Sequence, residues 1–181
     1  MHEIDAINQR RSESVGTLMQ YQQQLYLSLV KNGRALENVP AELRDDKLIV
    51  LAAVQQNGNA LKHASAELQT DPEIVLAAVT QYGSALQYTT RLLRGDEHIV
   101  LAAVTPSVRA FAAQDGRAFQ HATAKLHSNR NFVLAVAKRN GWILQSAPDT
   151  LRGDLEIVKT AVMQDGRVLR YASKNMRTLT T

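Results

Sequence analysis

The chain of 181 residues contains no cysteine, and this absence excludes disulfide bonds, thiolate metal sites and cysteine nucleophiles together. Aromatic residues make up only 5% of the chain, with a single tryptophan, so surfaces on which nucleic-acid bases could stack are scarce. The glycines stand apart from one another, whereas a phosphate-binding loop needs several glycines close together ahead of a helix. What remains is an ordinary globular composition, with 45% apolar and 21% charged residues.

Long apolar runs are also missing from the sequence. The longest ones are far too short to cross a bilayer, so we expect no membrane span. The first residues show no basic region followed by an apolar segment, so we expect no secretory signal peptide. A cytoplasmic location is therefore expected by default, and export to a host by a non-classical route stays open.

Glycine marks an internal repeat. Six glycines share one sequence context, and they are Gly33, Gly58, Gly83, Gly116, Gly141 and Gly166. Their intervals are 25, 25, 33, 25 and 25 residues, so one interval carries eight extra residues. A fixed period of this length is typical of arrays in which short stacked units share one continuous core.

An apolar run in which alanine is prominent stands before each of the last five glycines, as in residues 74–79 (IVLAAV). Alanine favours a helix over a strand. An aspartate or asparagine precedes each run, where an N-cap would accept free backbone N–H groups. These expected caps are Asp46, Asp71, Asp96, Asn129 and Asp154. Pro72 follows one of them, at the first helical position that proline favours.

The glycine is expected to end this first helix in the left-handed conformation. A second helix of about 8–10 residues is expected to follow, because small and apolar residues recur on one face at helical spacing. The predicted fold class is all-α: a short α-solenoid of about six 25-residue helix–glycine–helix repeats with an N-terminal capping helix.

Residues 1–24 do not match the repeat and form the expected helical cap, for which a dimerisation helix is the alternative. The repeat array spans 25–178. Its expected units are 25–46, 47–71, 72–96, 97–129, 130–154 and 155–178. The unit 97–129 carries the eight-residue insertion, and Thr105-Pro106 in its middle predicts a kink or two consecutive helices.

Charge changes sign near this insertion. Residues 1–90 hold 7 Lys and Arg against 10 Asp and Glu, whereas residues 91–181 hold 14 against 7. We therefore expect a bend near 105–117 that separates an acidic block from a basic one and creates a concave surface. Such an asymmetry indicates an acidic partner for the basic half.

The string Val-Leu-Ala-Ala-Val, about four residues, Gly and then Ala-Leu-x-Tyr-Ala resembles the bacterial tandem helical repeats of the domain of unknown function 4116 family. Residues 74–88 and 97–104 carry this pattern most clearly, and the resemblance extends over about 47–178. It implies tandem short helices, in host-associated or environmental bacteria, with no assigned activity. It carries over no catalytic residue, because its motif residues build the core.

Candidate metal and acid–base groups have structural explanations. His63 and His121 share a position in units two apart. Stacked helices lie about 8–10 Å apart, whereas a zinc–nitrogen bond is about 2.0–2.1 Å, so these rings cannot share an ion. We expect them to be partly buried rings between units. The clustered carboxylates stand at helix starts and are explained as caps. We expect no metal, no cofactor and no catalytic residue.

Basic residues offer two patterns. Arg167, Arg170, Lys174 and Arg177 are spaced by 3, 4 and 3 residues, which predicts one face of the last helix. A solvated outer face of the terminal unit is the alternative explanation. In the second pattern, arginines share a register eleven residues after the glycine, where they would compensate helix C-termini or bind acidic groups. These are Arg44, Arg94, Arg152 and Arg177, with Gln69 and His127 between them.

The leading hypothesis is a non-enzymatic scaffold module that binds a protein partner through its basic second half. Trp142 would anchor that interface if it is exposed. The candidate partner-binding residues are Arg117, Arg139, Trp142, Arg167, Arg170 and Lys174. Nucleic-acid binding through the same basic half is the second hypothesis. A bacterial effector with a small pocket at the bend near 105–117 is the third. The oligomeric state stays open.

Overall fold

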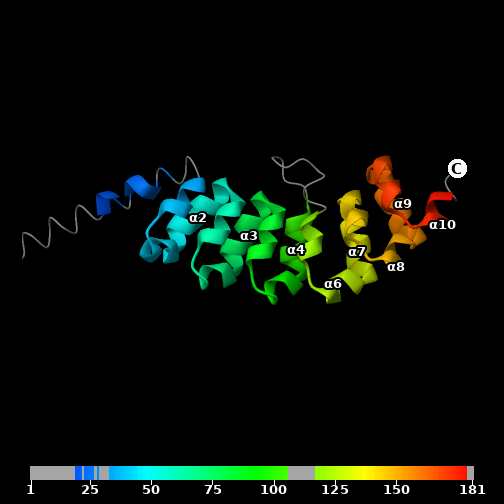
Figure 1. Ribbon diagram of the computed structural model, residues 1–181, viewed down its shortest axis with the longest axis horizontal. Coiled ribbons are helices and arrows are strands. Elements are labelled where there is room, and N and C mark those ends of the chain that lie inside the picture. Colours follow the sequence, from blue (N-terminus) through cyan, green and yellow to red (C-terminus); the bar gives the residue numbers. More distant parts are fainter. Residues whose placement is uncertain (1–18, 22, 27, 29–32, 106–116, 179–181) are drawn as a thin grey trace, which may run out of the picture.

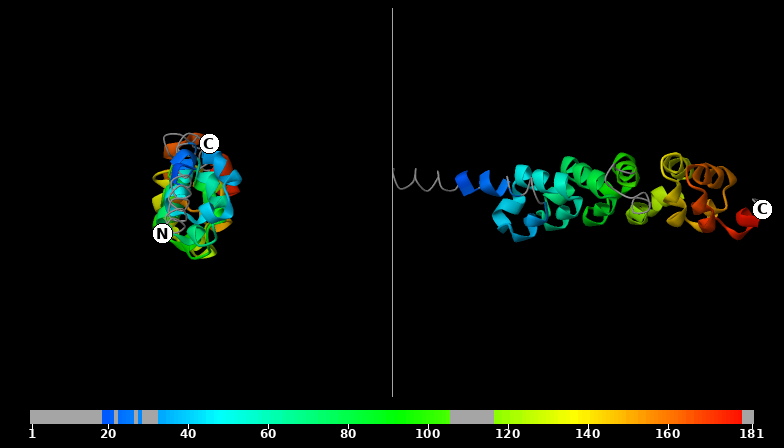
Figure 2. Two further views of the ribbon diagram at one scale, coloured as in Figure 1. Left: turned by 90° about the vertical axis from the view of Figure 1, so that its left-hand side faces the viewer. Right: turned by 90° about the horizontal axis from the view of Figure 1, so that it is seen from above.

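The computed structural model describes residues 19–21, 23–26, 28, 33–105 and 117–178 of the chain. Within these ranges every regular element is a helix, and the helices stand side by side in a row along one long axis (Figure 1). Views from the end and from above show how narrow the row is in cross-section (Figure 2). The fold is an all-α solenoid, as the glycine repeat predicts.

Each unit contains up to three helical pieces. The first piece is an α-helix, described as α2 (Lys47–Gln56), α3 (Pro72–Gln81), α4 (Glu97–Val104), α7 (Arg130–Ala137) and α9 (Leu155–Gln164). The second piece is a 3₁₀ helix, described as η1 (Gly33–Asn38), η3 (Gly58–His63), η5 (Gly83–Tyr88), η7 (Phe119–His121), η8 (Gly141–Gln145) and η9 (Gly166–Tyr171). The third piece is short, and its examples are η2 (Ala41–Asp45), η4 (Leu68–Thr70), η6 (Leu93–Gly95), α6 (Ala124–Ser128), α8 (Asp149–Arg152) and α10 (Lys174–Thr178).

The predicted N-caps are confirmed. The carboxylate of Asp46 accepts hydrogen bonds from the backbone N–H groups of Leu48 at 2.9 Å and Ile49 at 3.2 Å. The other four caps accept at least one such bond, and they are Asp71, Asp96, Asn129 and Asp154. Each cap satisfies backbone donors that the first turn leaves free, which stabilises a helix by about 1 kcal/mol.

The prediction of one continuous second helix is wrong. In the second unit the 3₁₀ helix η3 stops at Ala64, whose backbone is extended with φ −65° and ψ 160°. The next residue, Ser65, donates its backbone N–H to the carbonyl of Arg44 in the preceding unit at 3.0 Å. Equivalent bonds run from Thr123 to Arg94 and from Ser173 to Arg152. This bond between units ends the helix, because the N–H can no longer serve the helix itself.

The predicted left-handed glycines are also wrong. Among the described residues no glycine has a positive φ. Gly58, Gly83 and Gly141 each begin a 3₁₀ helix instead of ending an α-helix. A Cβ added to them would lie 2.1, 2.0 and 2.3 Å from a backbone carbonyl oxygen of the following unit. Glycine is required because the next unit packs directly against its backbone.

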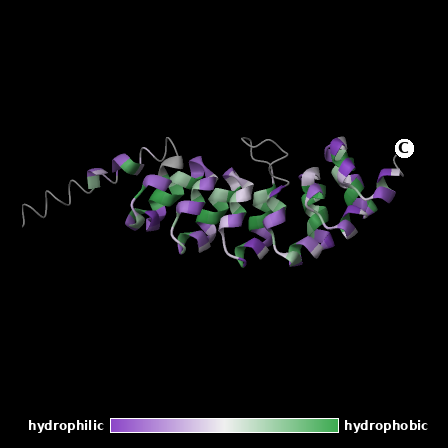
Figure 3. Ribbon diagram, in the orientation of Figure 1, coloured by the Kyte–Doolittle hydropathy of each residue, from purple (hydrophilic) through white to green (hydrophobic). Residues whose placement is uncertain are grey.

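The core is continuous along the row. One cluster of buried apolar residues extends from Leu36 to Ala172, and hydrophobic positions gather along the middle of the row (Figure 3). Adjacent α-helices contact one another, α2 with α3, α3 with α4, α4 with α7 and α7 with α9. Burial of each large aliphatic side chain contributes about 1.5–3 kcal/mol. The stack therefore supplies the stability that helices this short do not have alone in water.

Two expectations fall mainly outside the described residues: most of the N-terminal cap 1–24, and the bend near 105–117 with its pocket, of which only Thr105 and Arg117 are described. Helix α4 ends at Val104, and Thr105 is extended with ψ 123°, as a residue before proline should be. No helix in the described part of the chain combines the length and apolar character needed to cross a membrane.

Candidate interaction surface

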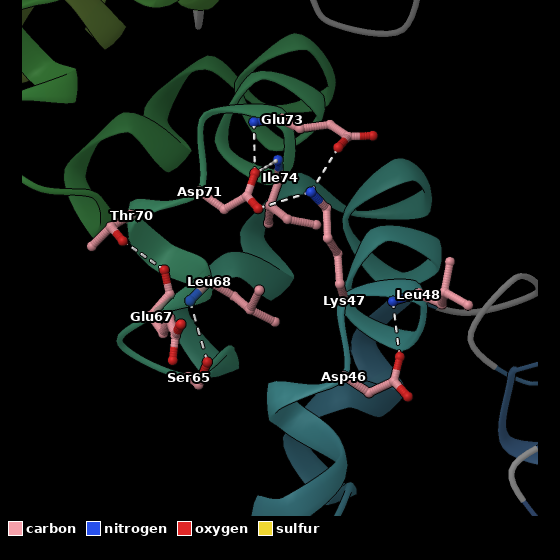
Figure 4. Close-up of polar contacts among 10 residues, drawn as sticks. All are labelled: Asp46, Lys47, Leu48, Ser65, Glu67, Leu68, Thr70, Asp71, Glu73 and Ile74. Carbon is pink, nitrogen blue, oxygen red and sulfur yellow. Dashed lines mark hydrogen bonds and ion pairs between the residues drawn. The ribbon is translucent and has the colours of Figure 1, made fainter.

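Ion pairs join neighbouring units at the starts of their α-helices. Lys47, the first residue of α2, lies 2.9 Å from a carboxylate oxygen of Asp71 and 2.7 Å from one of Glu73 (Figure 4). Asp71 is also the N-cap of α3, so one carboxylate serves the helix and the unit interface together. The hydrogen bond from Lys47 lowers the pKa of Asp71, and its two backbone bonds lower it further.

The same contact recurs toward the other end of the row. Arg130, the first residue of α7, lies 2.7 Å from Asp154 and 2.7 Å from Glu156. Its hydrogen bond lowers the pKa of Asp154. Neither contact was predicted from the sequence, although a signal was present. A basic residue directly follows one cap, and the next unit carries an acidic cap with a glutamate two residues later.

Within residues 117–178 of the basic second half, every carboxylate forms an ion pair with a cation of the same segment. Residues 117–178 contain eleven Lys and Arg but only four Asp and Glu. All four carboxylates form ion pairs: Asp149 with Arg152, Asp154 and Glu156 with Arg130, and Asp165 with Arg167. Seven exposed cations of this segment form no ion pair with any described residue, and we call them the unpaired cations. They are Arg117, Lys125, Lys138, Arg139, Lys159, Arg170 and Lys174.

Trp142 does not form an exposed anchor, because it is only 7% exposed. Its indole N–H donates to a carboxylate oxygen of Asp165 at 3.2 Å, and its ring lies 6.1 Å from that of Tyr171. The guanidinium groups of Arg167 and Arg170 lie 5.5 and 5.4 Å from the centre of the indole ring. The next unit therefore covers Trp142, and these five residues form one cluster, which we call the tryptophan cluster.

Asp165 holds the tryptophan cluster together. It accepts the backbone N–H of Arg167 at 2.9 Å and its guanidinium at 2.7 Å. The hydrogen bond from the Arg167 side chain is the main reason that the pKa of Asp165 is lowered to about 2. Asp165 was not predicted from the sequence. The signal that could have found it is the polar residue directly before three of the repeated glycines. These residues are Asn57, Asn140 and Asp165, and each caps the 3₁₀ helix that begins at the following glycine.

Arg170 is the cation that the tryptophan cluster orients. Its guanidinium lies 5.4 Å from the ring of Trp142 and 4.9 Å from the ring of Tyr171. Each such contact contributes about 0.5–1 kcal/mol at an exposed site. The side chain is exposed and forms no ion pair with a described carboxylate. The charge is therefore held in place and remains available.

The other candidate residues lie apart from this cluster. Arg117 precedes η7, Arg139 lies between α7 and η8, and Lys174 begins α10; all three are exposed. The prediction that Arg167, Arg170, Lys174 and Arg177 lie along one last helix is wrong. Arg167 and Arg170 belong to η9, whereas Lys174 and Arg177 belong to α10. The two helices are separate because Ala172 is extended with φ −65° and ψ 156°.

Of the side chains that stand eleven residues after a repeated glycine, Gln69 and His127 have a structural role. The side-chain amide of Gln69 donates to the carbonyl of Leu61 at 3.1 Å, and the His127 ring donates to that of Phe119 at 2.7 Å. These bonds satisfy carbonyls near the end of the preceding 3₁₀ helix. The Nε atoms of Arg44, Arg94 and Arg152 are buried and have no hydrogen-bond partner among the described residues. We therefore assign Gln69 and His127 to the fold, whereas the role of the arginines stays a prediction.

The two equivalent histidines are partly buried, as expected. Burial is the main cause that lowers the pKa of both His63 and His121. In the part of the chain that the structure describes, no group of three or more His, Asp or Glu residues is placed to hold a metal ion.

A family model described as "Domain of unknown function (DUF4116)" matches residues 24–69, 71–127 and 129–177, which together make up most of the chain. The chain belongs to the DUF4116 family. Each matched range of DUF4116 contains two of the repeated glycines. No curated protein and no solved structure matches the chain. Membership therefore establishes the tandem repeat and leaves the activity to be argued from the site.

Proposed function

We propose that this DUF4116 chain is a non-enzymatic helical-repeat module that binds an acidic segment of a partner protein through residues 117–178. The observation that carries the proposal is the charge pairing. Every carboxylate of this segment is paired within the row, whereas seven exposed cations have no described carboxylate partner. A surface of this kind attracts an acidic partner and speeds its association.

The burial of Trp142 favours a protein over a single-stranded nucleic acid. The guanidinium of Arg170 is oriented by two rings, and a guanidinium fork binds a carboxylate or a phosphate through two parallel hydrogen bonds. Single-stranded nucleic acids, in contrast, bind to exposed aromatic rings on which their bases stack. Trp142 is 7% exposed, so its ring offers no such surface.

Buried polar groups support a non-enzymatic role. Among the described residues, only Thr89 and Asn140 are buried polar side chains. The Thr89 hydroxyl donates to the carbonyl of Gln69 at 2.7 Å. The Asn140 amide donates to the carbonyl of Val104 at 3.0 Å and accepts the N–H of Trp142 at 3.0 Å. Both side chains are used by the fold, so neither serves as a buried reactive group.

The test compares two charge-matched variants in a nuclease-treated pull-down from the native cell. One variant carries Arg139→Glu with Arg170→Glu, and the control carries Lys62→Glu with Arg91→Glu, both outside residues 117–178. All four side chains are exposed, so both variants should fold, which circular dichroism checks. We expect wild type and control to capture an acidic protein that the first variant loses.

The captured protein is then purified, and its affinity is measured against all three proteins. Loss of the basic residues should weaken binding at least about tenfold, or 1.4 kcal/mol. Equal affinity for all three would show that the basic surface is only solvated. Capture that appears only without nuclease would make nucleic acid the ligand, and its affinity should then fall steeply with salt.

A further inference from the structure

Three of the repeated glycines form a notch that receives the next helix. The atom in each notch is the backbone carbonyl oxygen of an alanine, at 2.0–2.3 Å from where the Cβ would be. The three pairs are Gly58 with Ala78, Gly83 with Ala103, and Gly141 with Ala161. We call this space the glycine notch. It lets the α-helix of one unit approach the backbone of the preceding unit.

Gly166 forms the same notch in the last unit, but no atom of the described residues lies within 4 Å of the place where its Cβ would be. The side chains around it are uncovered as well. Leu169 is partly exposed, whereas its equivalents Leu61, Leu86, Phe119 and Leu144 are 0% exposed. Val162 is partly exposed, whereas Val54, Val79, Val104 and Ala137 are at most 1% exposed. The last unit thus presents an apolar surface that every described internal unit buries.

One unpaired cation belongs to this apolar surface. Lys159 is exposed and takes the place of a leucine that the other described units carry at Leu51, Leu76, Leu101 and Leu134. We define the end face as Lys159, Val162, Gly166 and Leu169. It combines an apolar centre with one basic residue at its border.

The interface between α2 and α3 shows which group would face Lys159. There Leu51, the equivalent of Lys159, lines one groove together with Glu73 near the start of α3. A helix docked on the end face in the same manner would place its corresponding side chain beside the Lys159 ammonium group. A carboxylate at that position is electrostatically complementary.

We propose that the end face binds an amphipathic α-helix of the partner protein. A small residue of this helix places its carbonyl in the notch of Gly166, and a carboxylate near its N-terminus pairs with Lys159. The inference rests on the proposed function and names the form in which the acidic partner binds. The interface continues one that the chain already forms three times, with the charge of its border changed.

A second copy of the chain is a poorer occupant. The helices that fit the glycine notches are already held by the preceding unit of their own row, α3 by α2, α4 by α3 and α9 by α7. A second copy would have to release one of them from its own core, which costs the burial energy of that contact. A helix from another protein has no such cost.

The test titrates the isotope-labelled protein with a synthetic peptide of residues 71–82, the helix that occupies the first notch. We expect saturable shifts of the Gly166 and Leu169 amide resonances. The variant Gly166→Val fills the notch, and because no atom lies near that position it should fold normally. We expect it to bind the peptide at least about tenfold more weakly, or 1.4 kcal/mol. Thr150→Val, at an exposed site in α8, is the matched control and should bind like wild type.

A peptide with Glu73→Lys should bind several times more weakly than the natural sequence. Equal binding of Gly166→Val and wild type, or shifts confined to residues outside the end face, would overturn the inference. So would light scattering that shows wild type associating with itself at rising concentration and Gly166→Val remaining monomeric, because the occupant would then be a second copy.

The pull-down separates this inference from the proposed function. Loss of the partner in Gly166→Val as well as in Arg139→Glu with Arg170→Glu supports both. Loss in the double variant alone supports the basic surface and contradicts the end face. Retention by both variants contradicts both proposals.

Discussion

Gly141 and Gly166 occupy the same place in consecutive units, yet their surroundings are opposite. Gly141 is buried, and an added Cβ would lie 2.3 Å from the carbonyl oxygen of Ala161. Gly166 is exposed, and no atom of the described residues lies within 4 Å of the place where its Cβ would be. Neither has a positive φ. The comparison shows that the neighbouring unit requires the glycine, whereas the local backbone conformation does not.

The largest expected effect comes from adding one methyl group to each of these glycines. Gly141→Ala should destabilise the protein by about 3 kcal/mol, because its Cβ forces α9 away from η8. In a chain of this length that lowers the melting temperature by roughly 6–12 °C. Gly166→Ala should change stability by less than about 0.5 kcal/mol. Thermal unfolding followed by circular dichroism measures both.

Equal destabilisation by Gly141→Ala and Gly166→Ala would contradict the conclusion that the neighbouring unit requires the glycine. It would mean that the backbone conformation requires glycine in both units. Gly83→Ala provides a second internal case. Its Cβ would lie 2.0 Å from the carbonyl oxygen of Ala103, so it should behave like Gly141→Ala.

A smaller effect is expected at the interface between α7 and α9, where the last unit contacts the preceding one. Asp96→Ala removes a cap that accepts the N–H of Ile99 at 2.9 Å and should cost about 1 kcal/mol. Asp154→Ala removes a cap and also the contact with Arg130, so it should cost about 0.2–1 kcal/mol more. Urea unfolding of the two variants gives the difference.

Asp154→Asn is the informative companion, because asparagine still caps a helix while the charge is lost. Asp154→Asn should keep most of the stability that the cap contributes and lose only the contribution of the ion pair with Arg130. A double-mutant cycle with Arg130→Gln should return the same contribution. A coupling energy of zero would show that the contact between Arg130 and Asp154 does not stabilise the last interface.

The smallest effect is a dependence on pH at the tryptophan cluster. The pKa of Asp165 is lowered to about 2, chiefly by the Arg167 side chain, whereas an aspartate in an unfolded chain titrates near about 3.9. The charged carboxylate therefore contributes stability above about pH 4, and this contribution is lost as the pH falls through about 2.

Asp165→Asn tests this dependence. The difference in unfolding free energy between wild type and variant should be constant above about pH 4 and shrink below it. Trp142, the only tryptophan, reports unfolding by its fluorescence. A difference that stays constant down to about pH 2 would show that Asp165 does not stabilise the cluster through its charge.

Much of the fold was accessible from the sequence because the signals are local. Asp46 and Asp71 bond to backbone groups two and three residues away, so their position before an apolar run predicts the helix start. The burial of Ile74, Val75 and Val79 follows from their helical spacing. The pairing of Arg130 with Asp154 and the hydrogen bond between Trp142 and Asp165 join residues 24 and 23 positions apart, so the repeated motifs that carry these residues could be interpreted only once the stacking of the units was known.

The candidate site was predicted only in part, because its contacts join residues of different units. Arg167 and Arg170 do converge, but they do so on Trp142 of the preceding unit and not along one continuous helix. Trp142 was expected to be useful if exposed, and the following unit covers it. The binding roles of all six candidate residues stay predictions.

The sequence by itself determined the helical repeat, the helix starts and the net charge of each half, because these follow from periodicity, capping and composition. Only the tertiary structure decided that the second helix breaks after six residues, since the bond from Ser65 to Arg44 lies between units. It also decided why glycine recurs. The carbonyl of the next helix occupies the space of a Cβ at Gly141 and leaves it open at Gly166.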